Sequence, residues 1–356
     1  MNNIVSQLFK YQRDKQDVEN NLKNGRIDIT GKYDSVNMPL FNQSDENPYH
    51  LIAKKISEKK ITHIVTIARG TSDCVALYAS YLFAKILGLT TYSLPPSIIT
   101  LENSHFDFSN TLVIVISQSG LSEDLIKCEI ASREMGGETI ILSNNLNSPM
   151  VNSANYFFNI NAGKEVSVAA TKTFILSLLN VVKLVAIIKN HKEILNNILK
   201  LPEHLNKELN NPWEAELIDK NISSGFIISR GLGYALSTEI SLKFKELCQE
   251  QIEPFSSAEV MHGPKSLIQN SFKLFTLSLN DPSGRSVAVD TEKLMEITNK
   301  VYEIKSNSKN NSNLTFQTLN SPELDSIIIM SKFYPWIIKY SKHKGLNPDS
   351  PRYLTK

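Results

Sequence analysis

The feature that most constrains the fold is an internal repeat with an offset of 161 residues. Ile67-Ala68-Arg69-Gly70 is echoed by Ile228-Ser229-Arg230-Gly231, since 228 − 67 = 161, and each copy closes a short apolar run. At the same offset, Ile116-Ser117 falls on Leu277-Ser278, again at the end of an apolar run, since 277 − 116 = 161. A shared offset at two such places indicates a duplicated structural unit. A chain of 356 residues is long enough for two units with a core each.

Short apolar runs alternate with helix-like periodicity through the first half of the chain. Residues 74–87 have the periodicity of a helix, and the expected strands are residues 61–68, 111–116, 139–142 and 156–160. Short apolar strands separated by helices predict a parallel sheet that helices cover on both faces. We therefore predict an α/β fold of two lobes, each a doubly wound, three-layer αβα unit, related as a pseudo-repeat.

The chain divides into three segments on this interpretation. Residues 1–45 are expected to form a helical arm, residues 46–200 the first lobe and residues 210–356 the second lobe. Alternation of helix and strand begins at Pro48, a residue suited to the first turn of a helix. A long helical stretch, residues 171–209, separates the two lobes.

Charge and cysteine usage exclude several classes of protein. Lys and Arg number 38 against 36 Asp and Glu, so a nucleic-acid partner is not indicated. The most apolar run, residues 174–188, contains Asn180 and Lys183 and is shorter than the roughly 20 apolar residues that span a bilayer, so we expect no membrane segment. No export signal is visible, and the three cysteines form no C-x-x-C pair, which fits a reducing cytoplasm. No metal or organic cofactor is called for.

The turn Ser117-Gln118-Ser119-Gly120-Leu121-Ser122 follows an apolar strand and precedes an amphipathic stretch. The start of a helix offers backbone N–H groups and positive potential, and serine hydroxyls complete an anion cradle. No Lys of a G-x-x-x-x-G-K-[ST] motif is present, so a phosphate monoester is favoured over a nucleotide triphosphate. A serine-rich turn that only begins a helix remains the alternative. A second such turn, Gly70-Thr71-Ser72, at the end of the first strand favours the binding site.

Glu239, Lys243 and Glu246 form a second candidate group, because their spacing of i, i+4 and i+7 places them on one helix face. Such a face is often only a set of solvated ion pairs. Apolar residues surround this one, however, so much of the helix is expected to be buried. Burial raises the pKa of a carboxyl group and a nearby lysine lowers it again, as suits a general base. Glu246 is the candidate base.

His262 lies in Glu259-Val260-Met261-His262-Gly263-Pro264. A lone histidine is more often structural than catalytic, but Gly263-Pro264 predicts a turn that presents the ring at a loop edge. Because histidine titrates near neutral pH, it suits the proton transfer that opens a cyclic sugar.

Together these motifs resemble the sugar isomerase (SIS) family, in particular the isomerase domain of glucosamine-6-phosphate synthase and the type II glucosamine-6-phosphate deaminases. The resemblance runs from about Ile61 to the last residue. Its motifs are Arg69-Gly70-Thr71-Ser72, Ser117-Gln118-Ser119-Gly120, Val168-Ala169-Ala170-Thr171-Lys172, Glu239 to Glu246, Ala258-Glu259-Val260-Met261-His262-Gly263-Pro264 and Pro351-Arg352-Tyr353-Leu354-Thr355-Lys356. One departure is Leu121, which stands where the synthase has a glutamate.

The resemblance implies a role for each candidate residue. The phosphate of the substrate would be held by Ser72, Ser117, Gln118, Ser119 and Ser122. Val168 and Glu239 would lie at the sugar. Glu246 would move the proton between C1 and C2 with support from Lys243, His262 would open the ring, and Lys356 would form a Schiff base with the keto sugar. A homodimer with a shared active site is also implied.

The expected activity is isomerising deamination of glucosamine 6-phosphate to fructose 6-phosphate and ammonia. The synthase also needs a glutaminase with an amino-terminal cysteine, whereas the first cysteine here is Cys74, so glutamine hydrolysis is not expected. The alternatives on the same scaffold are the isomerase part of a synthase, a galactosamine-6-phosphate deaminase and a deglycase of sugar–amino acid adducts. A non-catalytic sugar-phosphate sensor is the alternative from another class.

Overall fold

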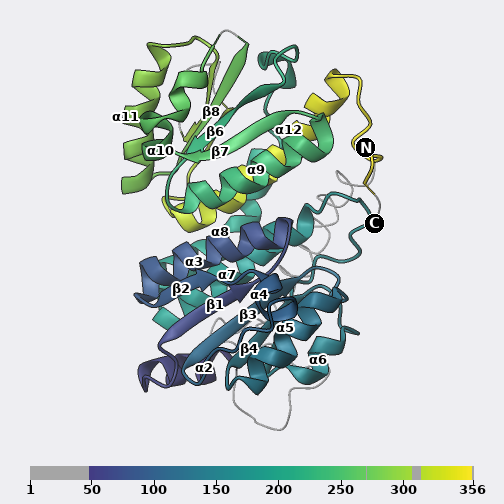
Figure 1. The fold of residues 1–356 in the computed structure, drawn as a ribbon. Coiled ribbons are helices and arrows are strands. Elements are labelled where there is room, and N and C mark those ends of the chain that lie inside the picture. Colours follow the sequence, from purple (N-terminus) through teal and green to yellow (C-terminus); the bar gives the residue numbers. More distant parts are fainter. Residues whose placement is uncertain (1–47, 270, 307–313, 355–356) are drawn as a thin grey trace. The chain divides into compact units, whose positions relative to one another are not determined.

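A computed structural model describes residues 48–269, 271–306 and 314–354, which form two compact units (Figure 1). Within these residues, the first lobe comprises the chain up to Glu165 together with Lys172–Asn196. The second lobe comprises Val166–Thr171 and the chain from Asn197 onward. The predicted arm, residues 1–45, lies outside the described residues.

The first lobe contains a five-stranded parallel sheet in the order β2-β1-β3-β4-β5. Its strands are β1 (His63–Ile67), β2 (Thr90–Ser93), β3 (Thr111–Ser117), β4 (Glu138–Ser143) and β5 (Tyr156–Asn159). Every residue of β3 is buried. A central parallel strand with both faces covered has this uninterrupted apolar pattern.

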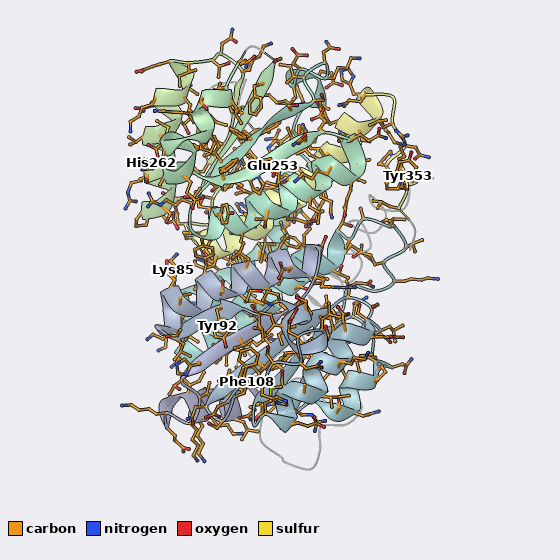
Figure 2. The ribbon with its side chains drawn as sticks, in the orientation of Figure 1. Lys85, Tyr92, Phe108, Glu253, His262 and Tyr353 are labelled. Atoms are coloured by element: carbon orange, nitrogen blue, oxygen red, sulfur yellow. The ribbon has the colours of Figure 1, made fainter. Side chains whose placement is uncertain are left out.

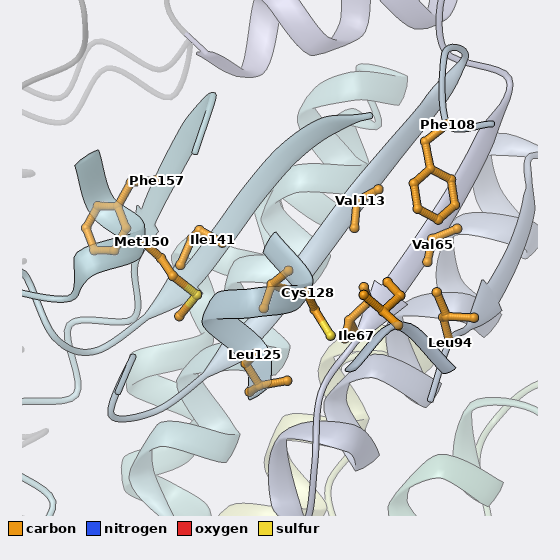
Figure 3. Packing of buried hydrophobic residues seen from close by; sticks show 12 residues of the cluster. Val65, Ile67, Leu94, Phe108, Val113, Leu125, Cys128, Ile141, Met150 and Phe157 are labelled. Atoms are coloured by element: carbon orange, nitrogen blue, oxygen red, sulfur yellow. The ribbon is translucent and has the colours of Figure 1, made fainter. Parts of the chain in front are cut away.

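Helices cover both faces of this sheet. They are α2 (Pro48–Ser57), α3 (Thr71–Leu87), α4 (Pro96–Thr100), α5 (Glu123–Glu134), α6 (Pro149–Ser153) and α7 (Lys172–Lys189). One core cluster joins alternate strand residues to α4, α5 and α6 (Figure 3). Val65, Val113 and Ile141 supply the sheet side, and Leu125 and Met150 the helix side. Helix α3 packs on α7, which forms the other layer.

The second lobe contains another five-stranded parallel sheet, in the order β10-β9-β8-β6-β7. Its strands are β6 (Ser224–Ser229), β7 (Gln251–Ser256), β8 (Phe272–Ser278), β9 (Val301–Ser306) and β10 (Leu314–Phe316). Its helices are α9 (Leu232–Cys248), α10 (Ser257–His262), α11 (Pro282–Met295) and α12 (Pro322–His343), with short 3₁₀ turns η1 (Ala215–Leu217) and η2 (Pro264–Leu267). Helix α8 (Lys192–Leu209) comes before these elements in the chain.

The repeat holds element for element around the first two crossovers. Helices α3 and α9 are both 17 residues long and begin 161 residues apart, since 232 − 71 = 161. Strands β3 and β8 are both 7 residues long at the same offset, since 272 − 111 = 161. The glycines before the two helices adopt the same backbone conformation, with φ 58° and ψ −133° at Gly70 and φ 61° and ψ −134° at Gly231. The prediction of two repeated α/β lobes is confirmed.

Local predictions are confirmed for four strands of the first lobe and for helix α3. The long helical stretch predicted for residues 171–209 is instead two helices, α7 and α8. The chain turns at Asn190, where φ is 53°, a left-handed conformation that ends helices. Sequence analysis did not predict strand β2, because four residues at a largely exposed sheet edge carry little apolar signal. No helix in the described residues is both long and apolar enough to cross a membrane.

Candidate active site

The two predicted phosphate-binding turns of the first lobe lie side by side at one edge of its sheet. Strands β1 and β3 are paired neighbours, and the chain leaves them in opposite directions, toward β2 and toward β4. Such a switch point at the carboxyl ends of parallel strands is where ligands bind in open α/β sheets. The turn with Ser72 follows β1, and the serine loop, residues 117–122, follows β3. A salt bridge of 3.0 Å from Arg69 to Asp124 joins the two turns.

The serine loop is partly buried and closely hydrogen-bonded. Ser117 is 3% exposed, and its Oγ accepts a hydrogen bond of 3.1 Å from the N–H of Gly120. Ser119 Oγ accepts one of 3.2 Å from the N–H of Leu121. These two N–H groups are therefore engaged inside the loop. The hydroxyl protons of Ser117 and Ser119 can still be donated to an anion.

Ser122 stands immediately before helix α5 and makes no side-chain capping hydrogen bond. The first N–H groups of a helix have no partner within the helix, and the helix dipole adds positive potential there. Ser72 lies in the first turn of α3, and Gly70, before that helix, likewise supplies no side-chain cap. Two helix N-termini thus converge on the switch point without a side-chain cap, as a phosphate site requires.

The second candidate group lies on helix α9 in the second lobe. Lys243 Nζ lies 3.2 Å from Glu239 Oε1 and 2.7 Å from Glu246 Oε2. The side chains of Glu239 and Lys243 are 0% exposed, whereas that of Glu246 is 22% exposed. The three side chains do share one helix face. The apolar surroundings expected around the base belong instead to Glu239, and Glu246 is the carboxylate that reaches solvent.

Burial and charge oppose each other in this group. Burial raises the pKa of Glu239, although Lys243 and the hydroxyl of Tyr334, which donates a 2.8 Å hydrogen bond to Glu239 Oε1, work against it. Burial alone would lower the pKa of Lys243, but the two carboxylates outweigh burial and its pKa is raised. Lys243 is therefore a buried cation that holds Glu246 in place.

His262 is the last residue of α10 and is exposed on the second lobe (Figure 2). Sequence analysis placed it at a loop edge; the structure puts it at the end of a short helix, followed by Gly263 and the turn η2. Val168 lies in Val166–Thr171, a segment that belongs to the second lobe. Lys356 lies outside the described residues.

Several residues that support these groups were not predicted from the sequence. Tyr334 on α12 binds Glu239 but lies in a largely buried helix, where nothing in the sequence marks it. Asn145 and Ser148 contact the serine loop from the segment after β4. Their signal was available, because a run of Asn and Ser after a predicted strand marks a polar turn at the same sheet edge. No group of three or more His, Cys, Asp or Glu residues suited to a metal ion occurs among the described residues.

Comparison with known proteins places this arrangement among the phosphosugar isomerase folds. A protein from Silicibacter pomeroyi assigned as a phosphosugar isomerase has 28% sequence identity and a TM-score of 0.74, over 85% of this chain and 92% of that one. Glucosamine-6-phosphate deaminase from Thermotoga maritima has the same fold, with 16% identity and a TM-score of 0.67 over 86% of this chain and 93% of that one.

The family profile of the SIS domain matches residues 55–187. Glutamine–fructose-6-phosphate aminotransferase (isomerizing) from Sulfolobus acidocaldarius is 29% identical over 322 residues, which are 86% of this chain and 52% of that protein. The chain thus spans about half the length of the curated relatives it matches. The resemblance drawn from the motifs is confirmed.

Proposed function

We propose that this chain isomerises and deaminates glucosamine 6-phosphate, giving fructose 6-phosphate and ammonia. The observation that carries the proposal is Glu246, a partly exposed carboxylate held 2.7 Å from a fully buried lysine. A carboxylate fixed in this way suits proton transfer between adjacent carbons. The uncapped helix ends at the first-lobe switch point support recognition of a phosphate ester.

The proposed reaction begins when His262 moves the proton that opens the sugar ring. Glu246 then takes the proton from C2 and returns one to C1, through an enolamine. The product is an imine at C2, and one water molecule hydrolyses it to the ketone and ammonia. A positioned general base contributes about 10²- to 10⁴-fold to the rate of such a step. We assign Lys356 a Schiff base with the keto sugar, as the family resemblance implies.

Phosphate binding supplies orientation in this scheme. Ser72, Ser117, Gln118, Ser119 and Ser122 hold the phosphate in the first lobe. Val168 contacts the sugar. Glu239 was expected at the sugar as well, but its complete burial supports a different role, in which it fixes Lys243 and acts through that residue.

A second candidate is the isomerase part of a glucosamine-6-phosphate synthase. It is favoured because the curated relatives are aminotransferases of this kind and the chain matches about half of each. Such a part would interconvert glucose and fructose 6-phosphates, but would release little ammonia from glucosamine 6-phosphate.

The test mixes the protein with glucosamine 6-phosphate in the absence of glutamine, and measures ammonia and fructose 6-phosphate. The proposal predicts equal amounts of both products. Isomerisation of glucose 6-phosphate without ammonia release would favour the second candidate. Binding of the sugar phosphate without turnover would indicate a sensor, and both enzymatic proposals would fail.

We also propose that the chain works as a homodimer in the cytoplasm, with His262 serving the partner's active site. If so, mixing inactive Glu246→Gln and His262→Ala proteins restores part of the activity, because mixed dimers contain one intact site. Absence of any recovery in demonstrably mixed dimers would contradict a shared site.

A further inference from the structure

In an anion-binding turn, the backbone carbonyl oxygens must point away from the anion. Each peptide unit carries an N–H donor, which attracts a phosphate oxygen, and a carbonyl oxygen, which repels it. In a trans peptide these two groups point in opposite directions. A turn that presents donors to a phosphate therefore needs its carbonyl oxygens directed to the other side and paired there.

Three successive carbonyl groups of the serine loop are paired in this way. All three accept from one segment, residues 144–148, which joins β4 to α6. The bonds are Asn144 N–H to Gln118 O at 3.3 Å, Asn145 Nδ2 to Ser119 O at 2.8 Å, and Ser148 Oγ to Gly120 O at 2.7 Å. Two of the three donors are side chains, so the pairing depends on the identity of residues 145 and 148.

The opposite side of the loop carries the donors. The N–H groups of Gly120 and Leu121 are donated to Ser117 Oγ and Ser119 Oγ. A hydroxyl that accepts a hydrogen bond becomes a better donor through its own proton, because hydrogen bonds in a chain polarise one another. Pairing the carbonyls therefore orients the serine hydroxyls as donors for an anion.

The supporting segment is itself fixed. Asn145 Oδ1 accepts a 3.0 Å hydrogen bond from the N–H of Asn147, and Ser148 Oγ accepts one of 3.2 Å from Met150 at the start of α6. At Gly120 a Cβ atom would lie 2.5 Å from Ser148 Cβ, and φ is +63°. Only glycine allows the loop to approach Ser148 this closely.

We infer that Asn145 and Ser148 are positioning residues, which hold the serine loop with its carbonyl groups turned away from the substrate phosphate. This inference rests on the proposed function only in that the serine loop binds a phosphate ester. Neither residue needs to touch the substrate, and both should affect binding more than the chemical step.

The test compares Asn145→Leu and Asn145→Asp with the wild-type protein. Leucine has a similar size and removes the donor to Ser119. Aspartate keeps the oxygen that accepts from Asn147 but lacks the donor and adds a negative charge, so it tests whether the segment stays folded, and Asn145→Leu measures the loss of the donor alone. Asn147→Ala is the matched control, because it alters an exposed side chain of the same segment.

Calorimetry measures the Kd for inorganic phosphate and for glucosamine 6-phosphate, and ammonia release measures KM and kcat. For Asn145→Leu we expect Kd and KM to rise about five- to tenfold, as for the loss of one hydrogen bond, and for Asn145→Asp they should rise further because of its negative charge, with kcat within about twofold for both. Asn147→Ala should match the wild type. Wild-type affinity in Asn145→Asp, or a fall in kcat at unchanged Kd, would overturn the inference. If the wild-type protein itself binds neither ligand, the proposed function fails as well.

Discussion

The two lobes share one topology, yet they treat the same sheet edge in opposite ways. In the first lobe, Ser122 precedes α5 without capping it. In the second lobe, Asp281 caps the corresponding helix α11, and its Oδ1 accepts a 2.8 Å hydrogen bond from the N–H of Gly284. The carboxylate of Asp281 occupies the position where the first lobe would bind an anion. The start of α11 is therefore capped by a carboxylate, which disfavours an anion at this helix end.

The turn after the first strand of each lobe also differs, because it is more open in the first lobe than in the second. A Cβ atom on Gly70 would meet nothing within 4 Å, whereas one on Gly231 would lie 2.7 Å from Ser283 Oγ. In the second lobe, Ser229 also donates a 2.6 Å hydrogen bond across the sheet to the carbonyl of Leu277. The two lobes therefore share one backbone arrangement. A few side chains fill the space beside Gly231 that is empty beside Gly70.

The second lobe instead concentrates buried charge. Besides Glu239 and Lys243, its buried pairs include Lys332 with Glu208 at 3.0 Å and Lys273 with Glu250 at 2.7 Å. Buried ion pairs add little net stability but hold side chains in fixed positions. On the proposed function, these fixed positions would help the second lobe to orient its carboxylate Glu246.

The largest effect is expected at the charged group of the second lobe. Glu246→Gln should lower the rate of ammonia release by about 10²- to 10⁴-fold, because the general base is lost. The Kd for glucosamine 6-phosphate, measured by calorimetry, should stay within about twofold of the wild-type value, because the first lobe holds the phosphate. Glu253→Gln is the control, since Glu253 is a partly exposed partner of Lys245 on α9. Loss of binding in Glu246→Gln would mean that Glu246 is structural.

A pH dependence specific to the second lobe is expected from Asp325 on α12. Burial raises the pKa of this carboxyl group from 3.8 to about 6, against hydrogen bonds from Thr318 and Leu319. Between about pH 4 and 6 the folded protein therefore keeps a proton that the unfolded chain has lost, so stability falls as the pH rises. The change amounts to about 3 kcal/mol at most.

Asp325→Asn removes this titration and keeps one oxygen that can accept from the N–H of Leu319, while its amide group can donate to Thr318 Oγ1. Urea unfolding of the wild type and this variant at pH 4 and pH 6 measures the effect. The difference in stability between the two proteins should depend on pH in this window and not above it. Parallel pH profiles would contradict the assignment.

A capping carboxylate before α5, like that of Asp281 before α11, should stabilise the helix and weaken phosphosugar binding. Ser122→Asp places a capping carboxylate before α5, so the helix should be stabilised by about 0.5–1 kcal/mol. The added negative charge should weaken phosphosugar binding about 10- to 100-fold. Ser122→Asn caps the helix without a charge, so it should weaken binding only a few-fold. Equal binding by the Asp and Asn variants would show that no anion binds at this helix end.

The smallest effect is expected from the reverse change in the second lobe. Asp281→Ala removes the cap of α11 and should cost about 1 kcal/mol of stability, measured by urea unfolding. Calorimetry should give the wild-type Kd for glucosamine 6-phosphate. A weakened affinity would indicate that this end of the second lobe also contributes to substrate binding.

The fold could be predicted from the sequence because its strongest signals are local and repeated. Buried parallel strands such as β3 are continuous apolar runs, and the offset of 161 residues follows from the arginine–glycine turns at Gly70 and Gly231. The edge strand β2 could not be predicted in this way, because it is short and largely exposed.

The candidate site was predicted less completely. Spacing on a helix gave Glu239, Lys243 and Glu246, but not which of them is buried, because the packing of α12 against α9 decides that. Tyr334 binds Glu239 across 95 positions of sequence, and no local pattern reports such a contact. The support of the serine loop by Asn145 likewise depends on β3 and β4 being neighbours in the sheet.

The central claim of the proposed function is that the first lobe binds the phosphate of the sugar, while Glu246 of the second lobe moves the proton between C1 and C2. The most direct test is nuclear magnetic resonance in heavy water, which follows the exchange of a C1 hydrogen of fructose 6-phosphate in the presence of ammonium chloride. We predict exchange with the wild type, almost none with Glu246→Gln at saturating sugar, and near-normal exchange with Ser119→Ala once the sugar is saturating. Exchange by Glu246→Gln at the wild-type rate would contradict the claim.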